Sequence, residues 1–384
     1  MNADLSRRRF IQSSACAACA FSLGGGVWGA TELTPTQELS DREAMHYEHL
    51  DGLTIRCLLC PKECRVADKE RGYCGVRENH GGAYKTLVYG RPCSFGVDPI
   101  EKKPLFHYLP GTGAFSLATA GCNIECKFCQ NWDISQFRPE QIRMFDCPPA
   151  DIAQLAIEKK CQTIAYTYSE PVIFYEYMLD CADEGRKKSL GSVMISNGYI
   201  QEKPLRELLP KLTAVKIDFK AYTEKFYKQT CSGELQPVLK ALEIIHEMGV
   251  WLELVVLIIP TLNDSDDETK GMVQWISEHL GKDVPIHFTR FHPMYKIKNL
   301  PSTPIPTLER LHKIAKQAGL NYVYIGNVPG HTAENTYCPK CNNVVIRRLG
   351  YKIMLDGFED GKCKKCKTPI PGVWKDPLKD ESRR

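Results

Sequence analysis

Three cysteines stand close together in the chain, at Cys122, Cys126 and Cys129, in a C-x3-C-x2-C arrangement. Structural zinc sites and electron-transfer iron–sulfur clusters are normally closed by four protein ligands. A three-cysteine cluster leaves one iron free to bind a molecule that is not protein, as a catalytic metal site requires. The alternative is a zinc knuckle or a ferredoxin fragment with a fourth ligand elsewhere. It is disfavoured because residues 130–132 bring no further cysteine.

Two groups of four cysteines flank this triplet among the 18 cysteines of the chain. Such C-x2-C and C-x3-C pairs suit metal binding, whereas disulfide frameworks belong to shorter secreted chains. The C-terminal group has two C-x2-C pairs across a predicted hairpin and predicts a zinc ribbon or rubredoxin-like site, with zinc favoured over iron. The N-terminal group is irregularly spaced and leaves zinc, a second cluster and a structural staple open. The two groups are Cys338, Cys341, Cys363 and Cys366, and Cys57, Cys60, Cys64 and Cys74.

The spacing of the triplet, with an aromatic residue before its last cysteine, resembles the signature of radical S-adenosylmethionine (SAM) enzymes. In those enzymes the open iron chelates the amino and carboxylate groups of SAM. Further motifs across roughly residues 45–370 resemble the radical SAM enzyme of the AmmeMemoRadiSam system, a relative of pyruvate formate-lyase activating enzymes. These motifs are CLLCPKECRVADKERGYCGVR (57–77), TYSEP (167–171), SNGY (196–199), RFHPMY (290–295), GNVPG (326–330) and TYCP (336–339).

The resemblance implies that the triplet ligates a [4Fe–4S] cluster and that this cluster and SAM are the cofactors. Glu170 is expected to accept hydrogen bonds from the SAM ammonium group, although Tyr168 and Ser169 replace the two glycines of the family motif. Phe128 is expected to lie against the adenine, where a flat apolar face suits the base. A core aromatic is the alternative for Phe128.

Five further residues are expected to bind the cofactor by the same resemblance. Ser196 and Asn197 would contact the ribose or carboxylate of SAM, with a simple turn as the alternative. Asp218 and Lys220 match an Asp-x-Lys strand in which the aspartate helps hold a cation near that carboxylate. An isoleucine before Ser196 replaces a second carboxylate, which leaves this cation site open. His292 would face the substrate opening, unless its role is structural.

The resemblance implies reductive cleavage of SAM to methionine and a 5′-deoxyadenosyl radical. The radical would then abstract hydrogen from a protein or peptide, as in activating enzymes, although a small-molecule substrate stays open. A low-potential electron donor is an expected partner. The alternative function is that of an iron–sulfur electron-transfer or metal-binding protein without SAM chemistry. A net charge of +4 and the lack of a basic–aromatic stripe argue against nucleic acid as a partner.

A parallel α/β scaffold is predicted to position these residues, because short apolar runs alternate with amphipathic stretches from residue 114 onward. The polar candidates follow strand ends, where a (β/α) barrel assembles its site. Six or seven units in roughly 215 residues favour a partial (β/α)6-type TIM barrel over a doubly wound sheet. Strands are predicted at 114–120, 163–168, 191–196, 214–219, 251–259, 285–291 and 322–326, and helices at 150–160, 172–187, 236–248, 266–280 and 307–318.

The N-terminus resembles a twin-arginine export signal, with the sequence SRRRFIQ at residues 6–12. The apolar stretch that follows is too short to span a bilayer. We therefore expect a periplasmic protein with no integral membrane span in the mature chain, the alternative being a cytoplasmic enzyme with an uncleaved N-terminus. The predicted divisions are a signal segment (1–30), an N-terminal Cys-rich metal-binding module (31–112), a radical SAM partial barrel (113–330), a zinc ribbon (335–372) and a charged tail (373–384).

Overall fold

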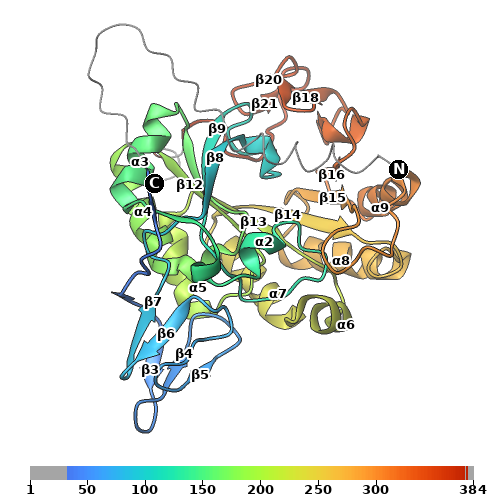
Figure 1. Ribbon diagram of the computed structural model, residues 1–384. Coiled ribbons are helices and arrows are strands. Elements are labelled where there is room, and N and C mark those ends of the chain that lie inside the picture. Colours follow the sequence, from blue (N-terminus) through green and yellow to red (C-terminus); the bar gives the residue numbers. More distant parts are fainter. Residues whose placement is uncertain (1–32, 377, 379–384) are drawn as a thin grey trace, which may run out of the picture. The chain divides into compact units, whose positions relative to one another are not determined.

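The computed structural model describes residues 33–376 and 378, so the predicted signal segment lies outside the described residues. The largest element is an 8-stranded sheet with the order β16-β15-β14-β13-β12-β11-β9-β8 (Figure 1). Strand β8 (Ser94–Pro99) pairs antiparallel with β9 at one edge, and the other pairs are parallel. The parallel strands are β9 (Gly113–Ala118), β11 (Thr163–Tyr166), β12 (Gly191–Ser196), β13 (Ala214–Asp218), β14 (Trp251–Ile258), β15 (Ile286–Arg290) and β16 (Val323–Gly326).

Helices connect the parallel strands and cover the outer face of the sheet (Figure 1). Their amphipathic pattern explains this placement, since α9 buries Leu308, Leu311 and Ala315 at three- and four-residue spacing. The side chain of Ser265 caps α8 by accepting a hydrogen bond from the backbone of Glu268 (3.3 Å). The helices are α3 (Pro149–Glu158), α4 (Tyr175–Lys187), α5 (Glu202–Leu208), α7 (Leu235–Glu247), α8 (Asp266–His279) and α9 (Ile305–Gln317).

The parallel strands cross the sheet in the same order as they occur along the chain. A doubly wound sheet would reverse this order at a switch point, so that alternative is wrong. A sheet wound in one direction curls toward a barrel. The barrel is partial, because no pairing among the described residues joins β16 to β8. The predicted α/β partial barrel is therefore confirmed.

The N-terminal module consists of two small antiparallel sheets that share one hydrophobic core with the barrel. The module ends before β8, because residues 94–99 join the barrel sheet although the sequence analysis placed them in the Cys-rich module. A further strand, β1 (Thr34–Thr36), pairs with β10 (Met144–Asp146). The two small sheets comprise β2 (Arg42–Glu43), β7 (Ala83–Thr86) and β6 (Arg77–His80), and β3 (Tyr47–His49), β4 (Ile55–Cys57) and β5 (Arg65–Val66).

The C-terminal module contains the predicted hairpin and packs against the amino-terminal ends of the barrel strands. Arg348 donates a hydrogen bond to the carbonyl of Phe106 (2.8 Å), next to the buried start of β14. Val373 is buried as well, so the predicted charged tail begins within this packed region. The strands are β17 (Thr336–Tyr337), β18 (Val344–Leu349), β19 (Lys352–Met354), β20 (Phe358–Glu359) and β21 (Lys362–Cys363).

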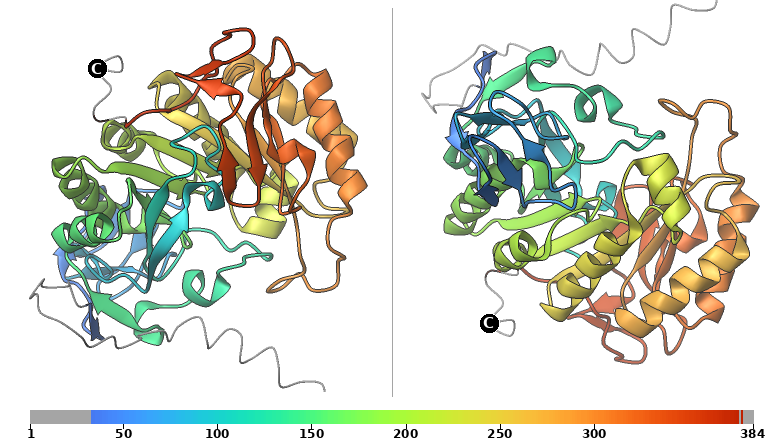
Figure 2. Two further views of the ribbon diagram at one scale, coloured as in Figure 1. Left: turned by 90° about the horizontal axis from the view of Figure 1, so that it is seen from above. Right: turned by 90° about the horizontal axis from the view of Figure 1, so that it is seen from below.

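The two cysteine-rich modules lie at opposite ends of the barrel. Figure 2 shows the C-terminal module on the side seen from above and the N-terminal module on the side seen from below. The N-terminal module contacts the carboxyl ends of the strands, where Arg77 Nε donates to the carbonyl of Ile173 (3.3 Å) beyond β11. Within the described part of the chain, no helix is both long and apolar enough to cross a membrane.

Candidate active site

The cysteine triplet lies in the loop between β9 and α2 (Trp132–Ser135), at the carboxyl end of the first parallel strand. Cys126 is buried, and Cys122 and Cys129 are half-buried. The backbone N–H of Cys129 donates to the carbonyl of Cys126 (3.0 Å), and the Cys129 Sγ lies 3.2 Å from Ser135 Oγ. These contacts curl the loop from Cys126 to Ser135.

Loops from three other strands hold the triplet loop in place across the mouth of the barrel. The amide of Asn123 donates to the carbonyl of Tyr199 (2.7 Å) beyond β12. The backbone of Lys127 donates to Thr230 (2.9 Å) beyond β13 and accepts from Lys296 (2.9 Å) beyond β15. The structure therefore gathers at one end of the barrel the segments that the sequence analysis placed after separate strands.

Glu170 is the centre of a buried hydrogen-bond network at the same mouth. Its Oε1 accepts from Ser196 Oγ (2.6 Å) and from the backbone of Val172 (3.1 Å), while its Oε2 accepts from the backbone of Asn197 (2.9 Å). Burial raises the pKa of Glu170 to about 7, despite these hydrogen bonds, which favour the ionised form. The Asn197 amide also donates to Asn123 Oδ1 (2.8 Å), which links the network to the triplet loop.

The two residues that replace glycines before Glu170 adapt to the site in different ways. Tyr168 has a φ of +66°, a left-handed conformation that favours glycine, and its carbonyl accepts from Asn131 Nδ2 (2.7 Å). The Tyr168 hydroxyl donates to the carboxylate of Asp98, on β8. Ser169 Oγ is buried without a hydrogen-bond partner among the described residues. A buried unpaired hydroxyl is unfavourable, so this position fits a polar ligand.

Asp218 at the end of β13 is paired with two lysines. Its carboxylate accepts from Lys216 and lies 3.2 Å from the Lys220 ammonium. Burial alone would raise the pKa of Asp218, but the two lysines outweigh burial and lower the pKa to about 2. The two lysines already neutralise the charge of the Asp218 carboxylate. The ion pairs therefore weigh against the cation site that the resemblance implied. The Lys220 ammonium also lies 5.9 Å from the centroid of the Phe128 ring, beside the triplet.

Two more residues belong to loops that follow the barrel strands, His292 after β15 and Cys231 after β13. His292, which was expected to face the substrate opening, is exposed, and its Nδ1 lies 3.0 Å from Ser302 Oγ. Cys231 ends a π-helix, η5 (Tyr227–Cys231), a feature that is frequent at functional sites. A hydrogen bond with the Cys231 side chain lowers the pKa of Cys126. No spacing pattern marks Cys231, so sequence reasoning missed it.

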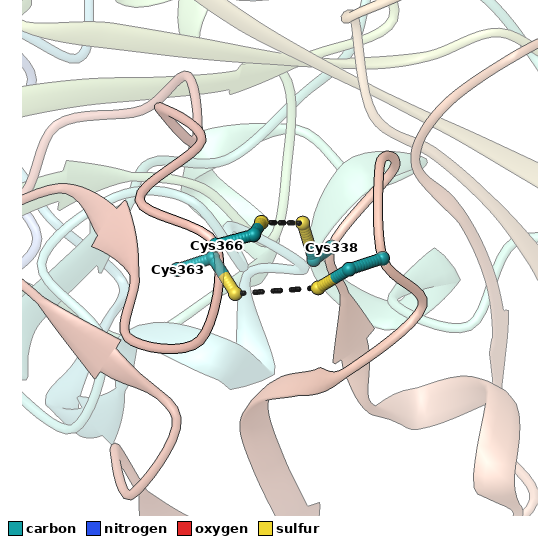
Figure 3. A group of neighbouring side chains, drawn as sticks. Cys338, Cys363 and Cys366 are labelled. Atoms are coloured by element: carbon teal, nitrogen blue, oxygen red, sulfur yellow. Dashed lines mark hydrogen bonds between the residues drawn. The ribbon is translucent and has the colours of Figure 1, made fainter.

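In the C-terminal module the side chains of Cys338, Cys363 and Cys366 point toward one another (Figure 3), and Cys341 completes the group. The Cys338 and Cys366 sulfurs lie 3.4 Å apart, and those of Cys341 and Cys363 lie 3.7 Å apart. All four sulfurs lie within 4.8 Å of one another. Zinc–sulfur bonds of about 2.3 Å bring four thiolates this close around one ion, so the group fits a single tetrahedral metal.

Comparisons with known proteins agree with the barrel and its mouth. The family model of the radical SAM superfamily matches residues 116–276, which include the triplet and Glu170. Uncharacterized protein MJ0808 of Methanocaldococcus jannaschii is 45% identical over 331 residues, which cover 86% of this chain and 98% of that protein. Uncharacterized protein MJ0674 of the same organism is 23% identical over 70% of this chain and 76% of its own length.

A similar solved structure is that of a domain of the pyruvate-formate lyase-activating enzyme from Bacteroides vulgatus. It is 14% identical, has a TM-score of 0.39, and covers 43% of this chain and 99% of that domain. The chain belongs to the radical SAM superfamily. It is therefore an enzyme of that superfamily, which implies a [4Fe–4S] cluster and SAM as its cofactors. The three thiols of the triplet and the unpaired Ser169 hydroxyl beside Glu170 fit these two groups.

Proposed function

We propose that the protein cleaves SAM reductively at a cluster held by Cys122, Cys126 and Cys129, and that it removes hydrogen from a protein or peptide. The observation that supports this proposal most directly is the hydrogen-bonded link from Glu170 through Asn197 to the triplet loop. When bound, the reduced cluster supplies the electron that splits SAM into methionine and a 5′-deoxyadenosyl radical. The role of the protein is to bind SAM, orient it and exclude water.

The buried charges at the mouth match the zwitterionic methionine end of SAM. The Glu170 carboxylate would accept from the SAM ammonium, and the unpaired Ser169 hydroxyl would donate to a neighbouring oxygen. Lys216 and Lys220 bring one positive charge more than Asp218 neutralises, which suits the SAM carboxylate. Ser196 and Asn197 hold Glu170 in place, so we assign them to positioning as well as to binding.

The mouth also has elements that would limit access of water to a radical. Tyr295, on the loop after β15, stacks on Trp132 of α2 with ring centroids 5.3 Å apart. The same loop is pinned to the triplet loop by the backbone of Lys127. His292 lies exposed on this loop, and we propose that it contacts the substrate rather than SAM. Phe128 is buried beside Lys220, which suits contact with the adenine.

We propose that the C-terminal cysteine group binds zinc as a structural site. Four cysteine ligands close the coordination shell and leave no position for a substrate. The C-terminal module that carries the group also lies on the side of the barrel opposite the N-terminal module (Figure 2). Zinc there would stabilise the packing of Arg348 and β18 against Phe106.

The substrate class is tested by following hydrogen into 5′-deoxyadenosine. The reduced enzyme would be incubated with unlabelled SAM and with perdeuterated cell extract that has been separated into protein, peptide and small-molecule fractions. We expect deuterium in 5′-deoxyadenosine, measured by mass spectrometry, with the protein or peptide fraction. Deuterium transfer from the small-molecule fraction alone would contradict the proposed substrate class and leave SAM cleavage intact.

A further inference from the structure

Four cysteines of the N-terminal module surround a cavity beside the triplet loop. The cavity has a volume of about 20 Å³. All four cysteines are free of disulfides. They come from the end of β4, from the turn that follows it and from the loop before β6. The cysteines that line the cavity are Cys57, Cys60, Cys64 and Cys74.

The spacing of these sulfurs does not suit one metal ion. Within the described residues, only the C-terminal group has three or more ligand atoms within 4.8 Å of one another. A single zinc with bonds of about 2.3 Å requires that closeness. In a [4Fe–4S] cluster each cysteine binds a different iron, so the sulfurs stand farther apart. Cys122, Cys126 and Cys129 also fall outside the single-ion spacing, so the N-terminal group resembles the triplet rather than the zinc-type group.

Backbone amides approach each of the four sulfurs. The N–H of Tyr73 donates to Cys64 Sγ (3.3 Å). Amide hydrogen bonds to cluster sulfurs stabilise their negative charge and tune the reduction potential. The other amides that approach are those of Leu59 toward Cys57, Lys62 toward Cys60 and Val76 toward Cys74.

A buried arginine adds positive charge to the same cavity. Arg77 lines it and is only 1% exposed. Its guanidinium pairs with Glu176, which is also buried, at 2.5 Å. This ion pair is neutral as a whole, but Arg77 lines the cavity together with the four cysteines and Glu176 is not among the lining residues. Such a placement favours thiolate ligands and a negatively charged group between them.

We infer that Cys57, Cys60, Cys64 and Cys74 hold a second [4Fe–4S] cluster. Four protein ligands close such a cluster, so it carries electrons and does not bind SAM. Reduction by a low-potential one-electron donor takes the cluster from the 2+ to the 1+ state, while the donor loses that electron.

The second cluster site adjoins the SAM site. The Cys74 carbonyl lies against Gly121, one residue before Cys122, and Asn123 lines the cavity itself. The electron would therefore pass directly from one site to the other. This last step rests on the proposed function, whereas binding of the second cluster does not.

The test compares reconstituted wild type with the variant Cys122→Ala/Cys126→Ala/Cys129→Ala, which leaves the cavity intact. We expect two [4Fe–4S] clusters per chain in the wild type and one in the variant, by iron and sulfide analysis and Mössbauer spectroscopy. SAM should leave the EPR signal of the variant unchanged. The control Cys161→Ala should keep both clusters, since this cysteine is remote from either group.

A wild type with one cluster, and a triple variant with none, would overturn the inference. So would zinc in the N-terminal group, detected as two zinc ions per chain with one cluster in the wild type. A second variant, Cys57→Ser/Cys60→Ser, should lose one cluster and keep the SAM-sensitive EPR signal. Formation of 5′-deoxyadenosine by the wild type tests the proposed SAM cleavage, whereas the cluster count tests the second cluster. The two proposals can therefore fail independently.

Discussion

The carbonyl oxygen of Cys74 lies 2.8 Å from the point that a β-carbon on Gly121 would occupy. Gly121 has a φ of +95°, so glycine is needed there for its backbone conformation as well as for space. The N-terminal module thus packs directly against the backbone that leads into Cys122. A change at this single glycine should therefore disturb the triplet loop and the module together.

We expect Gly121→Ala to destabilise the protein by about 2–4 kcal/mol, because backbone strain and overpacking add. The Cys74 oxygen belongs to the backbone and cannot rotate away, and Val76 Cγ1 lies 2.7 Å from the same point. Chemical denaturation of the metal-free wild type and variant measures the difference in their free energies of unfolding. The control is Gly249→Ala, which has a φ of +69° but open space around it and should lose only about 1–2 kcal/mol. Equal losses in both variants would contradict the close contact.

Burial of Glu170 predicts a pH dependence of stability. Its pKa of about 7 in the folded protein lies above the ordinary 4.5, so the folded state retains a proton that the unfolded state releases between these values. Stability should therefore fall as pH rises from about 5 to 7, by at most about 3 kcal/mol relative to Glu170→Gln. Urea denaturation of both metal-free proteins across this range measures the difference. Parallel pH profiles would show that Glu170 ionises normally.

The barrel could be predicted from sequence because its signals are local. Apolar strands and amphipathic helices recur in order, and strands such as β12 are buried along their whole length. Strand β8 was missed because it is an antiparallel edge strand in which two of the six residues are exposed and only one is buried. Helix α5 was missed because it is only seven residues long and contains Pro204 near its start.

The site was less predictable where it depends on contacts between distant segments. Glu170, Ser196 and Asn197 could be named from motifs, but the hydrogen bond from Asn197 to Asn123 joins loops that sequence spacing cannot place. The spacing of the N-terminal cysteines likewise says nothing about the distances between their sulfurs. The cavity that they line depends on how β4 and β6 pack over the barrel.

A structural metal at the C-terminal module predicts that Cys341→Ser lowers zinc content and thermal stability. Closed zinc sites contribute directly to folding, so the variant should melt several degrees lower. Metal analysis measures the zinc content, and thermal melting measures the stability. The matched control is Lys340→Ala, because Lys340 is exposed. The EPR signal of the SAM cluster should persist in Cys341→Ser at a permissive temperature. Full zinc content with an unchanged melting temperature would contradict a four-cysteine site.

The twin-arginine motif predicts export that depends on Arg7 and Arg8. Changing both to lysine keeps the positive charge but removes the arginine pair. We expect the tagged wild type in the periplasmic fraction and the double variant in the cytoplasm, by cell fractionation and immunoblotting. An identical distribution of the two forms would instead support the cytoplasmic alternative.

Formation of 5′-deoxyadenosine shows whether a cluster held by the cysteine triplet cleaves SAM. Anaerobically reconstituted protein would be incubated with dithionite and SAM, and the products separated by liquid chromatography and mass spectrometry. We expect the wild type and Cys161→Ala to release 5′-deoxyadenosine and methionine, and Cys126→Ala to release neither. A wild type that holds its [4Fe–4S] cluster yet forms no 5′-deoxyadenosine would contradict SAM cleavage at the triplet.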